Sequence, residues 1–198
     1  MGKRAIERAA QRIPELELQL VWKPFQLDPR LPASGKDKMQ HYLQKFGPSA
    51  KSFLVDPNNM LNTRGKPMGI EFVYHEGSKV FNSFNAHKLL AAAGLESVQK
   101  QNALMEVYFR QYFKEGKSLG LPEELIPGAV EAGMSEAEVR KVIDDDHLTE
   151  VVGDELANSH AKVRGVPHFY FPGGGEISGG ESTETFERTL RAAMAKAA

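Results

Sequence analysis

The stretch GVPHFYFPGGGEISG, residues 165–179, decides the fold of this chain. It contains a short apolar and aromatic run at 166–171, a turn at 172–175, and a second short run at 176–178. Aromatic and β-branched residues favour strands, whereas Pro and Gly favour turns. The stretch therefore predicts a β-hairpin. It does not predict a phosphate loop, because no Lys-Ser or Lys-Thr pair follows the glycines.

Apolar periodicity predicts two flanking helices and one further strand. Apolar residues recur at spacings of three and four over residues 2–13 and again after the hairpin, which is typical of amphipathic helices. Residues 16–22 alternate instead, so a strand with one apolar face is expected there. The residues that carry these patterns are Ile6, Ala9, Ala10 and Ile13, then Leu16, Leu18, Leu20 and Trp22, and finally Phe186, Leu190, Ala193 and Met194.

The middle of the chain is predicted to be mostly helical. Residues 31–67 are rich in Pro, Gly, Lys and Asn and read as the start of an insertion. A helix capped by Asn82 or Ser83 is expected to end at Gly94, and a second follows over residues 97–115. Ser135 with Glu138 predicts a capping box that opens another helix. We therefore expect one domain built from residues 1–35 and 160–198, and a mostly helical insertion at 36–159.

Composition excludes several classes of function. Lys and Arg number 25 and Asp and Glu 26, so no net field attracts nucleic acid or a membrane surface. No apolar run is long enough to cross a membrane, and the charged residues 3–8 do not resemble a signal peptide, which predicts a soluble, cytoplasmic chain. The sequence has no cysteine, which excludes a thiolate nucleophile, a disulfide and a Cys-based zinc site. No metal site is expected, because the histidines lack ligand spacing and Asp144, Asp145 and Asp146 beside His147 suit a solvated helix face.

Five segments, in order along nearly the whole chain, resemble proteins of the DsbA-like oxidoreductase family. The resemblance is strongest to the branch that contains the frenolicin-pathway disulfide isomerase, and it extends to 2-hydroxychromene-2-carboxylate isomerases and kappa-class glutathione transferases. The segments are GKR at 2–4, WKPFQL at 22–27, NSFNAHKL at 82–89, YFRQYFKEG at 108–116, and GVP at 165–167 followed by ISG at 177–179.

The order of predicted elements is helix, strand, helical block, hairpin and helix. This order indicates an α/β thioredoxin-like fold with an inserted helical subdomain, lacking the first strand. In the family, a motif resembling Cys-Pro-Trp-Cys-Tyr-Ile precedes the residues equivalent to Gly2, Lys3 and Arg4, and Met1 stands where the Ile would be. We therefore expect that the chain begins just after the catalytic motif, at an internal Met of a longer protein, or that it is a short form completed by a partner strand. Two exposed strand edges would follow, and with them a homo-oligomer paired through those edges.

The resemblance also implies where a substrate would bind. Pro167 matches the family's cis-proline, which presents the backbone of Val166 to an extended substrate. His168 follows it, although strand alternation can turn this side chain to the opposite face. Trp22 and Phe25 either line the cleft or belong to the core. No catalytic residue is present, because the family's cysteines would precede Met1, and Lys3 and Arg4 are unexplained without them. His87, in the third segment, is interpreted as a half-buried histidine with a satisfied ring.

Three functions stay open at this point. The first is a thiol-disulfide oxidoreductase that acts on polypeptides, and the 198 residues alone would then be redox-inactive. The second is an isomerase or transferase that uses glutathione as thiol co-substrate; no other cofactor is expected. The third is a binding module without enzyme activity, so the sequence leaves open whether this is an enzyme. In each case the expected partner is a polypeptide or a thiol peptide, bound by strand addition.

Overall fold

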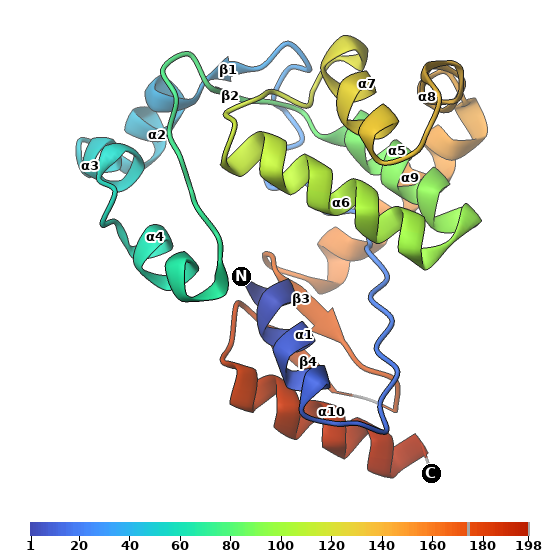
Figure 1. Cartoon of the computed structure of the whole chain (residues 1–198). Coiled ribbons are helices and arrows are strands. Elements are labelled where there is room, and N and C mark those ends of the chain that lie inside the picture. The colour runs from blue at the N-terminus through green and yellow to red at the C-terminus, as the bar shows by residue number, and fades with distance from the viewer. Residues whose placement is uncertain (174, 198) are drawn as a thin grey trace.

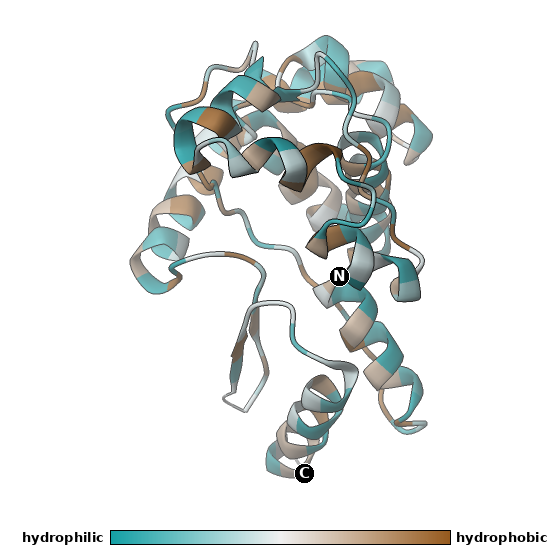
Figure 2. Ribbon diagram, turned by 90° about the vertical axis from the view of Figure 1, so that its left-hand side faces the viewer, coloured by the Kyte–Doolittle hydropathy of each residue, from teal (hydrophilic) through white to brown (hydrophobic). Residues whose placement is uncertain are grey.

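Helices dominate the computed structural model, which describes residues 1–173 and 175–197 (Figure 1). The helices are α1 (Gly2–Gln11), α2 (Lys38–Phe46), α3 (Ser49–Val55), α4 (Met60–Gly65), the 3-10 turn η1 (Lys66–Met68), α5 (Phe84–Glu96), α6 (Val98–Phe113), α7 (Pro122–Glu131), α8 (Glu136–Ile143), α9 (Asp146–Lys162) and α10 (Thr183–Ala197). They carry hydrophilic residues interspersed with hydrophobic ones, as amphipathic helices do (Figure 2). None of those in the described ranges is long and apolar enough to cross a membrane.

The described residues form two small antiparallel sheets. Strand β1 (Lys36–Asp37) pairs with β2 (Lys79–Val80), and β3 (His168–Tyr170) pairs with β4 (Glu176–Ser178), with Phe169 opposite Ile177. The predicted hairpin is thus confirmed. Gly173 in its turn has a φ of 79°, a conformation that glycine adopts without strain; Gly174, also placed in the predicted turn, lies outside the described residues.

Two apolar cores hold the molecule together. The upper core joins α5, α6, α7 and α8, and Leu89, Leu104, Leu125 and Val139 are fully buried in it. The lower core joins α1 to the β3–β4 hairpin and to α10 (Figure 1). Its buried members are Ala5, Ile6, Ala9, Ile13, Phe171, Ile177, Phe186 and Leu190.

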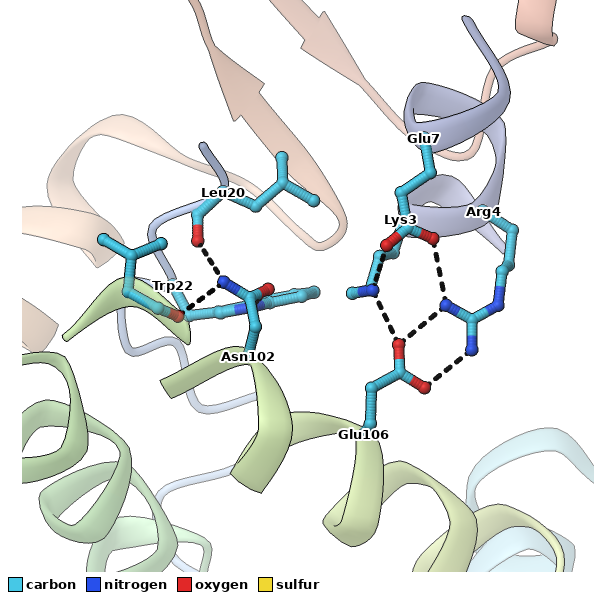
Figure 3. A network of polar contacts seen from close by, with 8 residues as sticks. Lys3, Arg4, Glu7, Leu20, Trp22, Asn102 and Glu106 are labelled. Carbon is cyan, nitrogen blue, oxygen red and sulfur yellow. Dashed lines mark hydrogen bonds and ion pairs between the residues drawn. The ribbon is translucent and has the colours of Figure 1, made fainter. Parts of the chain in front are cut away.

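The strand predicted over residues 16–22 does not form in the described structure. Side chains of α6 bind its backbone instead: Asn102 Nδ2 donates to the Leu20 carbonyl at 2.7 Å, and the Gln101 amide accepts from Trp22 N at 2.9 Å and donates to Trp22 O at 3.1 Å. Figure 3 shows the Asn102 contact. Alternation predicts which face is apolar, whereas a strand also needs a paired backbone, and the described residues place none beside this segment.

The junction of α5 and α6 lies at a side-chain cap and not at a glycine. The predicted stop at Gly94 is wrong, because α5 continues to Glu96. Gly94 does not have a positive φ, which a glycine cap would need. Ser97 ends α5 and begins α6, where its side chain accepts from Lys100 N. The capping box of Ser135 and Glu138 is confirmed at the start of α8.

A buried lysine joins α5 to the junction of α8 and α9. Lys88 is 1% exposed, and its Nζ donates to Ile143 O at 2.7 Å, Asp145 O at 2.8 Å and Thr149 Oγ1 at 2.7 Å. Asp145, from the acidic run, caps α9 by accepting from Leu148 N. Helix α9 passes through residue 160, where the sequence placed a domain boundary. The division into 1–35 with 160–198 and 36–159 stays a prediction.

Candidate functional site

Val166 is exposed and lies just before β3 of the hairpin. The Val166–Pro167 peptide bond, which the resemblance implies is cis, is cis in the structure. Pro167 O accepts from Gly179 N at 2.8 Å, which ties the start of β3 to the end of β4. Val166 is 47% exposed, and its N–H and carbonyl form no hydrogen bond within the described residues. It therefore offers one free donor and one free acceptor beside an edge strand.

The first turn of α1 packs against the side chains of Pro167 and Phe169. Gly2 is buried, and a Cβ built on it would lie 2.7 Å from Phe169 Cζ and 3.5 Å from Pro167 Cγ. Only glycine lets the helix approach β3 this closely. Helix α1 has no side-chain cap at its start. Its first N–H groups and the positive end of its dipole are thus near Pro167, an arrangement that favours an anion or a thiolate.

The two cations that follow Gly2 have carboxylate partners. The Arg4 guanidinium binds Glu106 through both nitrogens, at 2.7 and 2.6 Å, and Lys3 Nζ lies 2.7 Å from the same carboxylate. Glu7, one turn further along α1, also pairs with both (Figure 3). The hydrogen bonds from Arg4 and Lys3 lower the pKa of Glu106 to about 2, although burial opposes this shift. This cluster joins α1 to α6, so Lys3 and Arg4 have a role that needs no cysteine. The sequence could not indicate it, because Glu106 lies in a distant helix.

His168 is held within the hairpin. Its side chain is 12% exposed, its ring lies 4.7 Å from the ring of Tyr170, and its Nε2 is 3.3 Å from a carboxylate oxygen of Glu176. The geometry of that last contact is not that of a hydrogen bond, and it becomes an ion pair only when the imidazole is protonated.

Trp22 and Phe25 pack against the helices. Trp22 Nε1 donates to Asn102 Oδ1 at 2.9 Å, and its indole meets the Phe109 ring edge-on at 5.6 Å. Phe25 stacks on His160 at 4.6 Å. The described partners of both side chains lie outside the hairpin, so the structure does not gather them with Val166 and Pro167. Their role as site residues stays a prediction.

His87 has the structural role that the sequence indicates. Its Nε2 is 3.1 Å from the Phe25 carbonyl. Burial lowers the pKa of His87 to about 4, although the hydrogen bond with Phe25 opposes this. The ring is therefore neutral at pH 7 and supports the segment that carries Phe25.

Three features together are typical of a thioredoxin-like fold with added helices. They are a cis-proline before an edge strand, a helix that begins against it, and a separate helical core. The sequence matches the DSBA-like thioredoxin domain over residues 1–191. The chain belongs to the DsbA-like family.

The comparison with solved structures agrees with this fold. A probable DsbA oxidoreductase from Streptomyces coelicolor superposes with a TM-score of 0.84 at 24% sequence identity, over 98% of this chain and 83% of that one. A likeness at this identity concerns the fold alone. A comparison with curated proteins gives no match.

Proposed function

We propose that this chain binds an extended polypeptide or thiol peptide beside β3, through the backbone of Val166. The free N–H and carbonyl of Val166 next to Pro167 carry the proposal. Proline has no N–H of its own, so Val166 supplies both backbone hydrogen bonds at the point where a peptide would add to the edge.

The start of α1 supplies the second half of this site. A sulfur or carboxylate of the bound peptide that reaches Gly2 would meet unpaired N–H groups and the positive end of the helix dipole. The site can thus orient a peptide backbone and stabilise a negative charge. It cannot exchange a disulfide by itself, because that reaction requires a thiolate and the 198 residues contain no cysteine. We propose that they bind without redox turnover.

Glutathione-dependent isomerisation or transfer is the second candidate. Glutathione is itself a short peptide, so Val166 could bind its backbone while the α1 N-terminus stabilises its thiolate. In this case the thiol comes from the ligand, and the absence of cysteine from the chain does not prevent turnover.

Replacing the Val166 backbone donor tests the binding site. Val166→Pro removes the free N–H, whereas the control Val166→Ala shortens the side chain and keeps the backbone. A fluorescein-labelled nine-residue peptide with S-methylcysteine at its centre serves as probe, by fluorescence anisotropy, with folding checked by circular dichroism. We expect Val166→Pro to weaken binding about fivefold, as for one net hydrogen bond, and Val166→Ala to change it by less than about twofold. Equal affinity of Val166→Pro and wild type would contradict the proposal.

Activity assays separate the two candidates. In insulin reduction with dithiothreitol, the chain should match buffer. S-methylglutathione should compete with the labelled peptide if both use the Val166 backbone. Turnover of a glutathione-dependent isomerase substrate would favour the second candidate, and insulin reduction above buffer would contradict the absence of redox turnover.

A further inference from the structure

A hollow lies far from Val166 in the sequence, where the loop after η1 meets residues of α2, α3, α4 and α6. Its volume is about 70 Å³, several times the roughly 10–15 Å³ that one water molecule needs on the same measure. Its walls are aromatic and aliphatic, with one cation. The lining residues are Lys38, Tyr42, Phe53, Leu54, Asn59, Leu61, Phe72, Val73, Tyr74, Tyr112 and Phe113. We call this hollow the Lys38 pocket.

The ammonium of Lys38 has no acidic partner in the described part of the chain. The residue is 8% exposed, and its Nζ lies 4.1 Å from the centre of the Tyr112 ring. Within the described ranges, it makes no ion pair and no side-chain hydrogen bond. A buried cation is ordinarily paired. Lys88, the other buried lysine, has three oxygen partners, so the lack of oxygen partners for the Lys38 ammonium is not general to the described residues.

The start of helix α2 adds a second source of positive potential beside Lys38, the helix dipole. It is the first residue of α2, a helix of 9 residues, and Asp37 caps that helix by accepting from Gln40 N rather than by pairing with the ammonium. The ammonium therefore lies near the positive end of the α2 dipole, where a cation is disfavoured and an anion is favoured. Burial also lowers the pKa of Lys38 to about 8, which is the expected effect of a cation without a counter-charge.

The aromatic walls explain which kind of anion fits. The rings of Tyr42 and Phe53 stack at 6.5 Å with an angle of 15°, and those of Phe72 and Phe113 meet edge-on at 5.4 Å. Phe53 and Phe72 are only half buried, so both retain apolar surface that a ligand could cover. A simple inorganic anion would leave this surface exposed, whereas a flat apolar body would cover it.

We propose that the Lys38 pocket binds a small organic carboxylate with an aromatic body, such as an arylacetate. The carboxylate would pair with Lys38 Nζ, and the ring would lie among the side chains of Phe53, Leu61 and Phe72. This gives the buried ammonium the counter-charge that the described residues do not supply. The site is independent of the peptide site at Val166.

Three matched probes test the charge requirement on the full chain at pH 7. They are phenylacetate, neutral phenylacetamide and cationic 2-phenylethylamine, which share the phenyl ring. Binding is followed by chemical-shift changes in ¹H–¹⁵N spectra. We expect phenylacetate to bind about tenfold more tightly than phenylacetamide, and the amine more weakly still, because only the carboxylate forms a charged pair. The shifted amides should belong to α2, the 70–74 segment and the end of α6. Equal binding of the acid and the amide, or no binding of the acid, would overturn the proposal.

Two variants and a control locate the site. Lys38→Met should lower phenylacetate affinity about tenfold and change phenylacetamide affinity by less than about twofold. Lys36→Met, two residues earlier and exposed, should change neither. Phe53→Ala should weaken both ligands, because it removes apolar wall and leaves the charge. If Lys36→Met weakens phenylacetate as much as Lys38→Met, the carboxylate binds a diffuse basic surface and the proposal fails.

Discussion

Lys88 is a buried charge whose hydrogen bonds join α5 to α8 and α9. Its ammonium pairs with no carboxylate in the described part of the chain, but it donates to two carbonyls and one hydroxyl at the junction of α8 and α9. One of these carbonyls, that of Ile143, belongs to the last residue of α8. The negative end of that helix dipole therefore supplies part of the counter-charge.

Lys88→Met should destabilise the fold by about 3 kcal/mol. Methionine fills a similar volume, but it removes three charge-assisted hydrogen bonds and leaves Ile143 O without its donor. The measurement is the free energy of unfolding in urea at pH 7. Lys141→Met, on the exposed face of α8, is the control and should change it by less than about 0.5 kcal/mol. A loss for Lys88→Met no larger than that of the control would show that the three acceptors find other donors.

At the scale of the element, glycine has opposite effects in two helices. Gly2 lets α1 begin against Phe169, with 2.7 Å from a built Cβ to the ring, whereas a Cβ on Gly153 in α9 would meet nothing within 4 Å. Gly2→Ala should cost about 1–3 kcal/mol through overpacking. Gly153→Ala should stabilise the chain by about 0.5–1 kcal/mol, because alanine favours a helix. Thermal unfolding of both variants gives the comparison, and a stabilising Gly2→Ala would mean that α1 does not pack on β3 this tightly.

The elements also show how far the sequence predicts the structure. The helices that contain residues 2–11 and 98–113 follow from apolar periodicity, the helix at 84–96 follows from the expected cap at its start, and the hairpin follows from its turn residues. The prediction of a strand at 16–22 is wrong, because the backbone of this segment bonds to the side chains of Gln101 and Asn102 and not to another strand. No feature of the sequence near residues 16–22 indicates that polar side chains of a distant helix will take the place of a neighbouring strand.

The candidate site was predictable only in part. Val166 and Pro167 came from the resemblance of GVP to the family, and the structure adds the unpaired backbone of Val166 and the nearby start of α1. Trp22 and Phe25 could not be assigned to cleft or core from the sequence, because an aromatic side chain suits both. The pairing of Arg4 with Glu106 depends on where α1 lies relative to α6. Apolar periodicity within each helix gives no information about that placement.

At the scale of the whole molecule, a few polar contacts fasten the α1 end of the lower core to the helices outside it. Arg4 and Lys3 bind Glu106 on α6, the Arg8 guanidinium donates to Pro67 O at 2.7 Å, and Arg64 donates to Gly180 O at 3.0 Å. Each contact contains a charged group, so its strength depends on salt, and the contacts at Glu106 also depend on pH because this carboxyl titrates.

Acid should weaken the link through Glu106. The pKa of this carboxyl is about 2 in the folded protein against an ordinary 4.5, so between these values the unfolded state binds more protons. The stability that Glu106 provides is therefore present above about pH 4.5 and is lost as the pH falls toward 2. Its side chain is 36% exposed, so solvent screening limits the contribution to about 1 kcal/mol.

Urea unfolding of Glu106→Gln at pH 7, 4 and 2 checks this expectation. The variant should be less stable than wild type by about 1 kcal/mol at pH 7, and the difference should vanish near pH 2. Glu150→Gln, exposed on α9, should differ from wild type at none of these values. A Glu106→Gln deficit that persists at pH 2 would mean that packing, and not charge, makes the contact.

The sequence separation between the residues of each core favours an order in which the two cores form. The upper core uses residues from Ala86 to Val139, whereas the lower core joins Ala5 to Leu190 across most of the chain. Closing the longer loop costs more chain entropy, so the upper core should nucleate folding and the lower core should assemble late.

In stopped-flow experiments, Leu104→Ala should then mainly slow refolding, and Leu190→Ala should mainly accelerate unfolding. A Leu190→Ala variant that refolds as slowly as Leu104→Ala would place α1 and α10 in the folding nucleus instead. The hairpin beside the exposed Val166 would then form with the first contacts of the chain rather than after them.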